Sequence, residues 1–153
     1  MTDTLRVRAL KLLARREHAR SELARKLAPH AGSAEELDAL LDELSARRLL
    51  SDARYAEMRL HGRAARFGNA RLAQELRMQG VADELIDSAL ADAGSELERA
   101  HAVWQRKFGG DPAPRDLAER NRQMRFLMSR GFGGETIRRV LRSDFDEIEQ
   151  KDE

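Results

Sequence analysis

Apolar residues recur along most of the chain at the three- and four-residue spacings of an amphipathic helix. Near the N-terminus, three such sets mark successive helices: Leu5, Ala9, Leu12 and Leu13; Leu23 and Leu27; and Leu37, Leu40, Leu41 and Leu44. No segment of useful length alternates apolar and polar residues, the pattern typical of a strand with one buried face. We therefore expect an all-α fold.

Polar residues mark where further helices begin. The stretches Ser33-Ala-Glu-Glu36 and Ser95-Glu-Leu-Glu98 are capping boxes, in which the serine hydroxyl accepts a hydrogen bond from the third following amide. Ser51-Asp52 and Asn69 are also residues preferred at helix starts.

Glycines and prolines indicate where helices stop. Gly80 and Gly131 stand where two short helices should end. Linkers are predicted at Ala93-Gly94 and at Gly109-Gly-Asp-Pro-Ala-Pro114, and the acidic tail from Asp144 is expected to fray.

An internal repeat relates the middle of the chain to its C-terminal part. Leu76 and Leu127 lie 51 residues apart, and each is followed by Gly at +4, an apolar residue at +5, Ile at +10 and Leu at +14. An earlier copy fits if Leu23 is aligned with Leu76 and about four extra residues are allowed in Pro29–Ser33. Unrelated amphipathic helices would explain the leucines but not the shared glycine step. We predict three three-helix repeats, at 1–50, 51–93 and 94–143, followed by the tail at 144–153.

Charge follows the same period. Charged residues make up 36% of the chain, yet 28 Lys and Arg against 27 Asp and Glu give a net charge of only +1. Residues 1–30, 59–80 and 99–130 carry +5, +4 and +5, while 31–58, 81–98 and 131–153 carry −4, −6 and −3. Solubility and helix pairing would explain this alternation. An elongated molecule with separate basic and acidic surfaces, suited to a patterned partner, would explain it equally well.

The chain carries no recognisable catalytic or metal-binding motif. It has no cysteine, and its four histidines show no i, i+4 pair of the kind that binds metal on a helix. Glycine-rich phosphate loops and nucleophile elbows are also missing. We expect no enzymatic activity, no metal and no cofactor. No run of apolar residues is long enough for a membrane span, so a soluble, cytoplasmic protein is expected.

Basic residues are the stronger indication of function. Of 28, 24 are arginine, whose planar guanidinium suits carboxylate and phosphate groups, although a GC-rich genome would give the same bias. Helical spacing predicts three basic faces: Arg8, Lys11 and Arg15; Arg59, Arg63 and Arg66; and Arg115, Arg122 and Arg125. A solvated helix surface is the simpler interpretation of each face, and a stripe that binds phosphates or acids is the alternative.

Aromatic residues are few, at 5% of the chain. Five of them fall on or beside apolar columns and are expected in small cores: Tyr55, Trp104, Phe108, Phe126 and Phe132. Phe67, between Arg66 and Gly68, could serve as an exposed stacking platform, but core anchoring is the favoured interpretation.

Four stretches of the chain follow the order of a known family: Ala14–Leu27 (ARREHARSELARKL), Leu50–Ala56 (LSDARYA), Phe67–Leu76 (FGNARLAQEL) with Gly80-Val81, and Arg125–Phe132 (RFLMSRGF). Through them the sequence resembles the RecX family of regulators of the bacterial recombinase RecA. The resemblance extends from about Leu5 to Leu141. Two positions depart from the family pattern: Ala19 replaces a serine, and Arg48 replaces a glycine. Both departures concern local geometry at helix ends or turns.

The resemblance implies tandem three-helix repeats in a curved, elongated array without catalytic residues. It also implies binding along the groove of the RecA–single-stranded DNA filament, with inhibition of ATP hydrolysis, strand exchange and co-protease action, and hence a role in recombination, DNA repair and the SOS response. We expect a monomer. Direct contact with single- or double-stranded DNA is left open, and a general nucleic-acid binder or a helical adaptor acting without RecA are the alternatives. The candidate partner-binding residues are Arg15, Arg16, Arg20, Arg25, Arg59, Arg63, Arg66, Arg71, Arg122 and Arg125.

Overall fold

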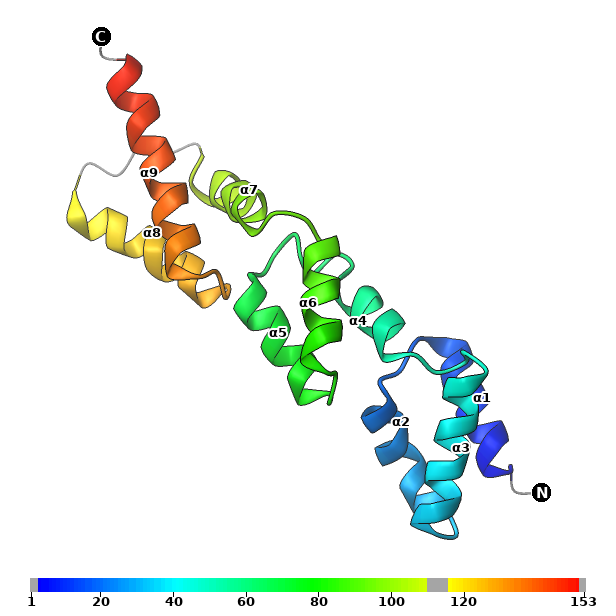
Figure 1. Cartoon of the computed structure of the whole chain (residues 1–153). Helices are drawn as coiled ribbons and strands as arrows, with labels where there is room; N and C mark the ends of the chain where they lie inside the picture. Colours follow the sequence, from blue (N-terminus) through cyan, green and yellow to red (C-terminus); the bar gives the residue numbers. More distant parts are fainter. Residues whose placement is uncertain (1–2, 110–115, 152–153) are drawn as a thin grey trace. The chain divides into compact units, whose positions relative to one another are not determined.

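The computed structural model describes the backbone of residues 3–109 and 116–151, and the side chains of these residues as far as Arg142. Over this part of the chain it contains nine α-helices, one short 3₁₀ helix and no strand, so the all-α prediction is confirmed (Figure 1). The helices are α1 Leu5–Arg15, α2 Arg20–Leu27, η1 Ala28–His30, α3 Ala34–Ala46, α4 Asp52–Leu60, α5 Asn69–Met78, α6 Asp83–Asp92, α7 Glu96–Phe108, α8 Leu117–Ser129 and α9 Gly134–Lys151.

The chain folds into two compact units. Unit 1 consists of Met1–Arg59 and Leu76–Ala89, and unit 2 of Leu60–Glu75 and Leu90–Glu153. The boundary therefore passes through α4, α5 and α6 rather than between helices. Leu60–Glu75 and Leu76–Ala89 belong to different units, so the middle of the chain contributes a segment to each.

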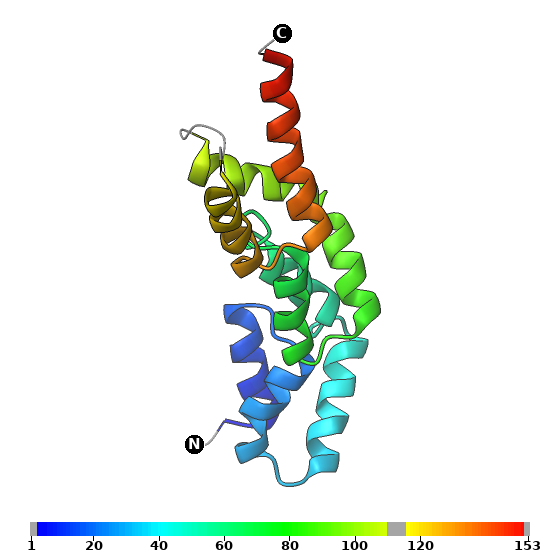
Figure 2. The same ribbon diagram turned by 90° about the vertical axis from the view of Figure 1, so that its left-hand side faces the viewer.

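In unit 1, the core between α1, α2 and α3 is built almost entirely from leucine. Helices α1, α2 and α3 pack against one another, as both ribbon views show (Figures 1 and 2). Their inward faces bury Leu5, Ala9, Leu23, Leu27, Leu37, Leu41 and Leu44, together with Leu50 from the following turn. These are mostly the positions that the helical spacing predicts, and their burial is what holds the three helices together.

The core of unit 2 contains most of the aromatic residues. Helices α7, α8 and α9 pack together around Ala100, Val103, Trp104, Phe108, Leu127, Phe132, Ile137, Val140 and Leu141. The Trp104 Nε1 group donates a 2.8 Å hydrogen bond to the Gln123 Oε1 atom, so the one polar atom of the buried indole is satisfied. The predicted burial of Tyr55, Trp104, Phe108 and Phe132 is confirmed, while Phe126 is partly buried.

Most of the predicted helix starts are confirmed. Both serines of the capping boxes accept hydrogen bonds, Ser33 Oγ from the Glu36 amide at 3.1 Å and Ser95 Oγ from the Glu98 amide at 3.3 Å. The Glu36 carboxylate does not return to the serine amide but accepts from the Gly32 amide at 2.8 Å. Helices α4 and α5 begin at Asp52 and Asn69, as the sequence indicates.

The repeat has a simpler register than the one predicted from sequence. Helix α2 begins at Arg20 and α5 at Asn69, 49 residues later; α3 begins at Ala34 and α6 at Asp83, again 49 residues later. A constant offset places Leu27 opposite Leu76 and requires no insertion, so the predicted pairing of Leu23 with Leu76 and the four extra residues are wrong. Leucines one helical turn apart are interchangeable in a sequence pattern, and only the helix starts separate the two registers.

The shared glycine step corresponds to a turn that closes a helix. Gly80 and Gly131 have φ angles of +77° and +89°. In each turn the amide of the residue after the glycine donates a hydrogen bond to a leucine carbonyl: Val81 to Leu76, and Phe132 to Leu127. This confirms both predicted stops, because glycine adopts the left-handed conformation at a helix end without steric cost. The predicted linker at Ala93-Gly94 joins α6 to α7, whereas Gly109–Pro114 falls largely outside the described residues.

Two glycines in unit 2 allow the backbone before α5 to touch the turn after α8. The Gly68 amide donates to the Arg130 carbonyl at 2.7 Å, and the Ala70 amide donates to the Gly131 carbonyl at 3.2 Å. A Cβ on Gly68 would lie 2.3 Å from the Gly131 oxygen, and a Cβ on Gly131 would lie 2.3 Å from the Arg71 Cβ. Both positions therefore require glycine.

Candidate functional site: basic clusters in the two units

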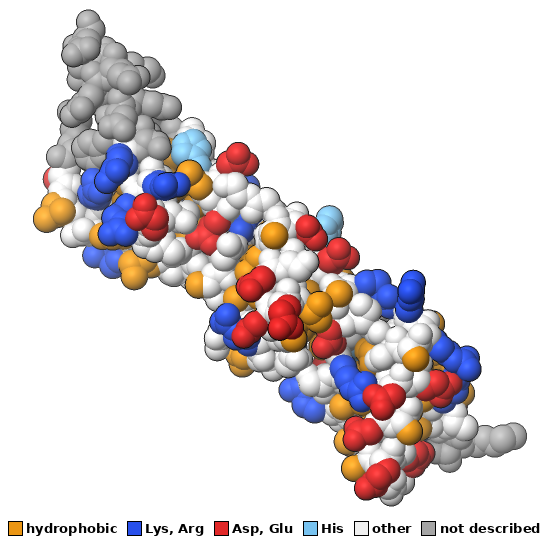
Figure 3. Space-filling model, viewed as in Figure 1, with side chains coloured by type: hydrophobic (Ala, Val, Ile, Leu, Met, Phe, Trp, Pro, Cys, Tyr) orange, Lys and Arg blue, Asp and Glu red, His pale blue; other side chains and the backbone are white. Residues whose placement is uncertain are grey.

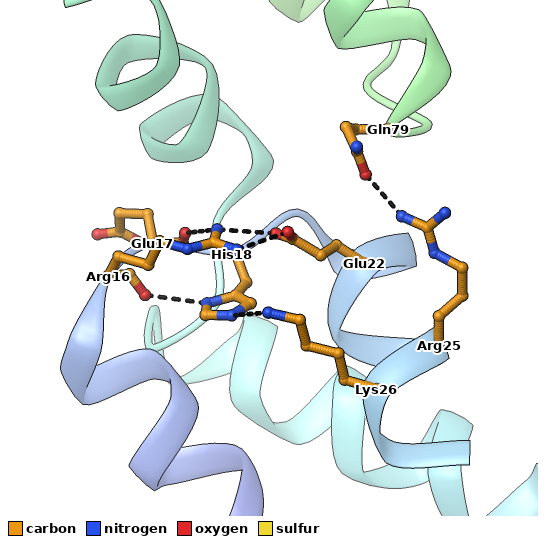
Figure 4. A network of polar contacts seen from close by, with 7 residues as sticks. All are labelled: Arg16, Glu17, His18, Glu22, Arg25, Lys26 and Gln79. Carbon is orange, nitrogen blue, oxygen red and sulfur yellow. Dashed lines mark hydrogen bonds and ion pairs between the residues drawn. The ribbon is translucent and has the colours of Figure 1, made fainter. Parts of the chain in front are cut away.

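A polar network surrounds His18 at the start of α2 in unit 1 (Figure 4). His18 is only 1% exposed, and its Nδ1 atom lies 3.0 Å from the Arg16 carbonyl while its Nε2 atom lies 3.0 Å from the Lys26 ammonium. A carbonyl can only accept and an ammonium can only donate, so these contacts require a neutral ring with its proton on Nδ1.

Burial and its neighbours hold this histidine neutral. Desolvation lowers the pKa of His18, and the cationic groups of Arg16 and Lys26 lower it further, while Glu22 and the Arg16 carbonyl oppose the shift. The Arg16 guanidinium binds both oxygens of Glu22 at 2.7 and 3.0 Å, and this hydrogen bonding lowers the pKa of Glu22. The network is therefore charged at its edge and neutral at its centre.

Three of the predicted site residues in unit 1 already have partners. Besides the pair of Arg16 with Glu22, Arg20 forms an ion pair with Asp42 at 2.8 Å, and Arg25 donates to the side-chain oxygen of Gln79 at 2.6 Å. These arginines hold the unit together, and only their remaining donor groups could reach a partner protein or nucleic acid.

The first predicted basic face forms a concave surface. Arg8, Lys11 and Arg15 of α1 line a hollow of about 330 Å³ together with Lys26 and His30. One carboxylate, that of Asp3, lines it too and binds the Lys11 ammonium at 2.7 Å. The helical spacing was therefore right for this face, and the fold adds cations from α2 and η1 that the sequence pattern did not connect with it.

The second predicted face is wrong. Helix α4 ends at Leu60, and Gly62 follows in the left-handed conformation with φ +81°. Arg63 and Arg66 therefore lie in the turns after the helix, and they do not continue the helix face that carries Arg59. A glycine with positive φ interrupts the i, i+4, i+7 pattern on which the prediction depended.

Instead, Arg63 and Arg66 join a cluster around Phe67 in unit 2. The guanidinium carbons of Arg71, Arg63, Arg130 and Arg66 lie 4.1, 4.8, 5.4 and 5.7 Å from the centre of the Phe67 ring. We call these four arginines the Phe67 cluster. Phe67 is 8% exposed, so the prediction of core anchoring is confirmed, but the cover of the ring is cationic rather than apolar.

One carboxylate offsets part of this charge. Glu75 accepts two hydrogen bonds from Arg63 and lies 3.6 Å from the Arg71 Nε atom. Arg66 and Arg130 have no carboxylate partner among the described residues. One negative charge therefore offsets one of the four positive charges, and Arg66 and Arg130 carry theirs beside the aromatic ring without an acidic partner.

A half-buried arginine outside the cluster fixes its backbone. Arg99 of α7 donates to the carbonyls of Ala64 and Phe67 at 2.9 and 3.0 Å and also to the Asn69 side chain. Burial lowers the pKa of its guanidinium. Beside it, the Glu96 carboxylate accepts from the Asn69 and Gly133 amides, both at 3.1 Å, so one acid caps the starts of α5 and α9.

Sequence reasoning missed Arg130, which lies 63 residues from Phe67 along the chain. The Gly68–Arg130 backbone hydrogen bond brings them together. The one signal that could have revealed this was Gly131, whose place in the repeat marked a tight turn at this point.

The third predicted face is only partly described. Arg122 forms an ion pair with Glu119 at 2.8 Å and lies 5.3 Å from the Phe108 ring, and its hydrogen bond lowers the pKa of Glu119. Arg125 is exposed on the same helix, whereas Arg115 lies outside the described residues. Figure 3 shows Lys and Arg side chains gathered where α8 and α9 overlap in this view, while over α1 to α3 basic and acidic side chains lie side by side.

Neither a metal centre nor a membrane span is found in the described part of the chain. No group of three or more His, Asp or Glu residues there is placed to hold a metal ion. None of the helices described is both long enough and apolar enough to cross a bilayer.

Comparison with known proteins decides the family. Models of the second and third three-helix domains of RecX match residues 51–90 and 95–141. A regulatory protein RecX of Leptothrix cholodnii is 55% identical over 91% of this chain and 88% of its own length. This chain belongs to the RecX family. A RecX of Ralstonia nicotianae is 48% identical over 90% of this chain and 86% of its own length.

A solved structure supports the same fold. The crystal structure of RecX from Lactobacillus salivarius superposes with a TM-score of 0.78, covering 91% of this chain and 93% of that one, at 18% identity. The relatives carry the name regulatory protein RecX, so this RecX-family chain belongs to a family of regulatory proteins with an all-α repeat fold. The boundaries predicted for the three repeats stay a prediction.

Proposed function

We propose that this chain is a non-enzymatic regulator that binds the RecA–single-stranded DNA filament in its groove and mainly inhibits ATP hydrolysis, strand exchange and co-protease action. Membership of the RecX family supports this proposal. The observation that carries it for this chain is the Phe67 cluster, in which four guanidinium groups converge on one ring against a single carboxylate. A filament presents acidic protein surface and DNA phosphate, and arginine binds both.

The cluster is suited to binding because much of its ordering is complete before a partner arrives. Phe67 is held by the Arg99 hydrogen bond to its carbonyl, and Arg71 and Arg63 are held by Glu75. Side chains already fixed in place lose less conformational entropy on binding. The remaining charge of Arg66 and Arg130 can then face the filament.

Titration of RecA's DNA-dependent ATP hydrolysis tests the proposal. We expect inhibition at protein-to-RecA ratios far below one, because a regulator of a filament acts on many subunits from each binding position. Absence of inhibition even at equal stoichiometry, with the protein folded and RecA saturated with single-stranded DNA, would contradict the proposed function.

Charge reversal then tests the cluster. The double variant Arg66→Glu/Arg71→Glu should raise the concentration needed for half-maximal inhibition about tenfold or more, since two attractive contacts become repulsive. The matched control is Arg47→Glu/Arg138→Glu, which changes net charge equally at two exposed i, i+4 and i, i+3 pairs. If both variants inhibit equally, at unchanged helicity and melting temperature, the Phe67 cluster is not part of the surface that binds the filament.

A further inference from the structure

A second cationic hollow adjoins the Phe67 cluster in unit 2. It measures about 260 Å³ and is lined by Arg66, Arg106, Lys107 and Arg130 around a floor of Val103 and Phe126. None of its lining residues is a carboxylate. The hollow of unit 1, by contrast, contains the acid Asp3.

The cations of the hollow come from three separate segments and are held apart from acids. Arg66 lies in the turn before α5, Arg106 and Lys107 lie on the last turn of α7, and Arg130 follows α8. Arg106 donates to the Ala65 carbonyl at 2.5 Å, which fixes its guanidinium at the rim. No described carboxylate forms an ion pair with any of the four, so the fold concentrates like charge that only an anion from outside would neutralise.

Two of these cations also belong to the Phe67 cluster. The Arg130 guanidinium carbon lies 5.4 Å from the Phe67 ring and 5.2 Å from the Phe126 ring, and Arg66 lies 5.7 Å from the Phe67 ring. The hollow and the cluster are therefore neighbouring parts of one basic surface that share Arg66 and Arg130. A ligand with charges repeated along its length can occupy both parts, whereas a single small anion can occupy only one.

The apolar floor of the hollow indicates which class of anionic ligand would fit it. Phe126 is partly buried and Val103 is only 5% exposed, so the carbon surface at the base of the rim of cations comes mainly from Phe126. A carboxylate side chain from an acidic protein would meet the rim but would have little to place against this floor. A nucleotide has a phosphate for the rim and a sugar and base for the floor. A duplex carries its phosphates on a convex surface, while a single strand can bend a nucleotide into a concave site.

We propose that this hollow binds one nucleotide of single-stranded DNA, with its phosphate on Arg66, Arg106, Lys107 and Arg130 and its sugar or base against Phe126. The neighbouring phosphate of the strand then meets the Phe67 cluster. This inference deepens the proposed function, since the filament would supply the strand, but its test uses DNA alone and so can fail independently of RecA.

The test measures binding of a fluorescein-labelled oligothymidylate by anisotropy over a range of salt concentrations. The variant Arg66→Gln/Lys107→Gln removes two cations of the hollow that make no hydrogen bond among the described contacts. It should weaken binding roughly tenfold and lower the slope of log affinity against log salt by about 0.7, the contribution of the one phosphate that the hollow holds. The control Arg47→Gln/Arg138→Gln has the same net charge as the hollow variant. It should bind the oligonucleotide as tightly as the unmodified protein does.

Three results would overturn the proposal. The unmodified protein could fail to bind the oligonucleotide, the hollow variant could keep the full salt slope, or poly-glutamate could bind with the same dependence on the hollow while DNA does not. The last result would assign the surface to an acidic protein. If the hollow variant loses DNA binding but still inhibits RecA's ATP hydrolysis, the DNA site stands and the regulator role does not depend on it.

Discussion

At the scale of single residues, Arg48 shows how a departure from the family pattern is accommodated. The resemblance predicts a glycine at this position, and Arg48 has a φ of +60°, the left-handed conformation that glycine adopts freely. Its amide still donates to the Ser45 carbonyl at 3.0 Å, so the turn at the end of α3 forms despite the side chain. The backbone at Arg48 thus keeps the left-handed conformation of a glycine, which is unfavourable for a residue with a side chain.

Replacing this arginine should therefore stabilise the protein. An L-residue in the left-handed region costs about 1–2 kcal/mol, and the extra chain entropy of glycine returns part of this. We expect Arg48→Gly to raise the free energy of unfolding by about 0.5–1 kcal/mol in urea denaturation. The neighbouring Arg47 has an ordinary φ of −85°, so Arg47→Gly should destabilise instead. A loss of stability in both variants would show that the turn does not strain Arg48.

His18 gives a prediction for the pH dependence of stability. Its pKa is lowered in the folded protein, so between that value and the unfolded value of about 6.5 the unfolded chain binds a proton that the folded chain does not. Stability should therefore fall as the pH drops below about 6.5, and this contribution should level off below the folded pKa.

The variant His18→Phe should lose this part of the pH dependence, because a phenyl ring can fill the site without titrating. The groups that face the ring are Arg16, Lys26 and Glu22, and only Glu22 among them titrates in the acid range. Urea denaturation of both proteins between pH 5 and 8 measures the difference. If their stability changes in parallel over this range, the histidine is not neutral in the folded state.

At the scale of the elements, α2 has a cap that comes from elsewhere in the chain. Its N-cap residue is Ala19, which has no side-chain acceptor, and the Arg20 amide instead donates to the Asp52 carboxylate at 2.8 Å. Asp52 is also the first residue of α4 and so sits where negative charge favours a helix start. One carboxylate therefore serves two helices, and it takes the place of the serine that the family pattern has at Ala19.

Removing that carboxylate should affect both helices. We expect Asp52→Ala to lower the free energy of unfolding by about 1–2 kcal/mol, the sum of a lost cap and a lost charge at a helix start. Asp52→Asn keeps the acceptor oxygen and should recover most of the cap. Thermal unfolding followed by circular dichroism compares the three proteins, and equal melting temperatures for the alanine and asparagine variants would contradict the capping role.

Secondary structure was largely predictable because its signals are local. The capping serines, Asp52, Asn69 and the two turn glycines all act within a few residues of themselves. The register of the repeat was predicted four residues off, since an amphipathic pattern is nearly unchanged by a shift of one helical turn. The prediction of a face with Arg59, Arg63 and Arg66 failed for a related reason: the arginines keep helical spacing in the sequence, although the helix ends at Leu60 and Gly62 turns the chain away.

At the scale of the whole molecule, the sequence shows how much charge each segment carries but not which charges meet. The basic balance of 99–130 and of 59–80 is visible in composition, yet the convergence of Arg130 and Arg66 depends on a backbone contact between residues 68 and 130. Contacts between distant segments leave no periodic trace. Each unit nevertheless contains a basic hollow. The hollow of unit 1 is lined by one acid, Asp3, and the hollow of unit 2 has no acid among its lining residues.

The contact between Gly68 and Gly131 constrains how the sequence can change over time. In most packed pairs, enlargement of one residue can be compensated by a smaller partner. Here the obstacle to a side chain at Gly68 is the backbone of Gly131, and the Cβ that Gly131 would gain meets the Cβ of Arg71. Both residues are already glycine and have no side chain to shorten. A side chain gained at one of the two positions therefore cannot be accommodated by a substitution at the other. The two positions can drift only if the path of the chain itself moves.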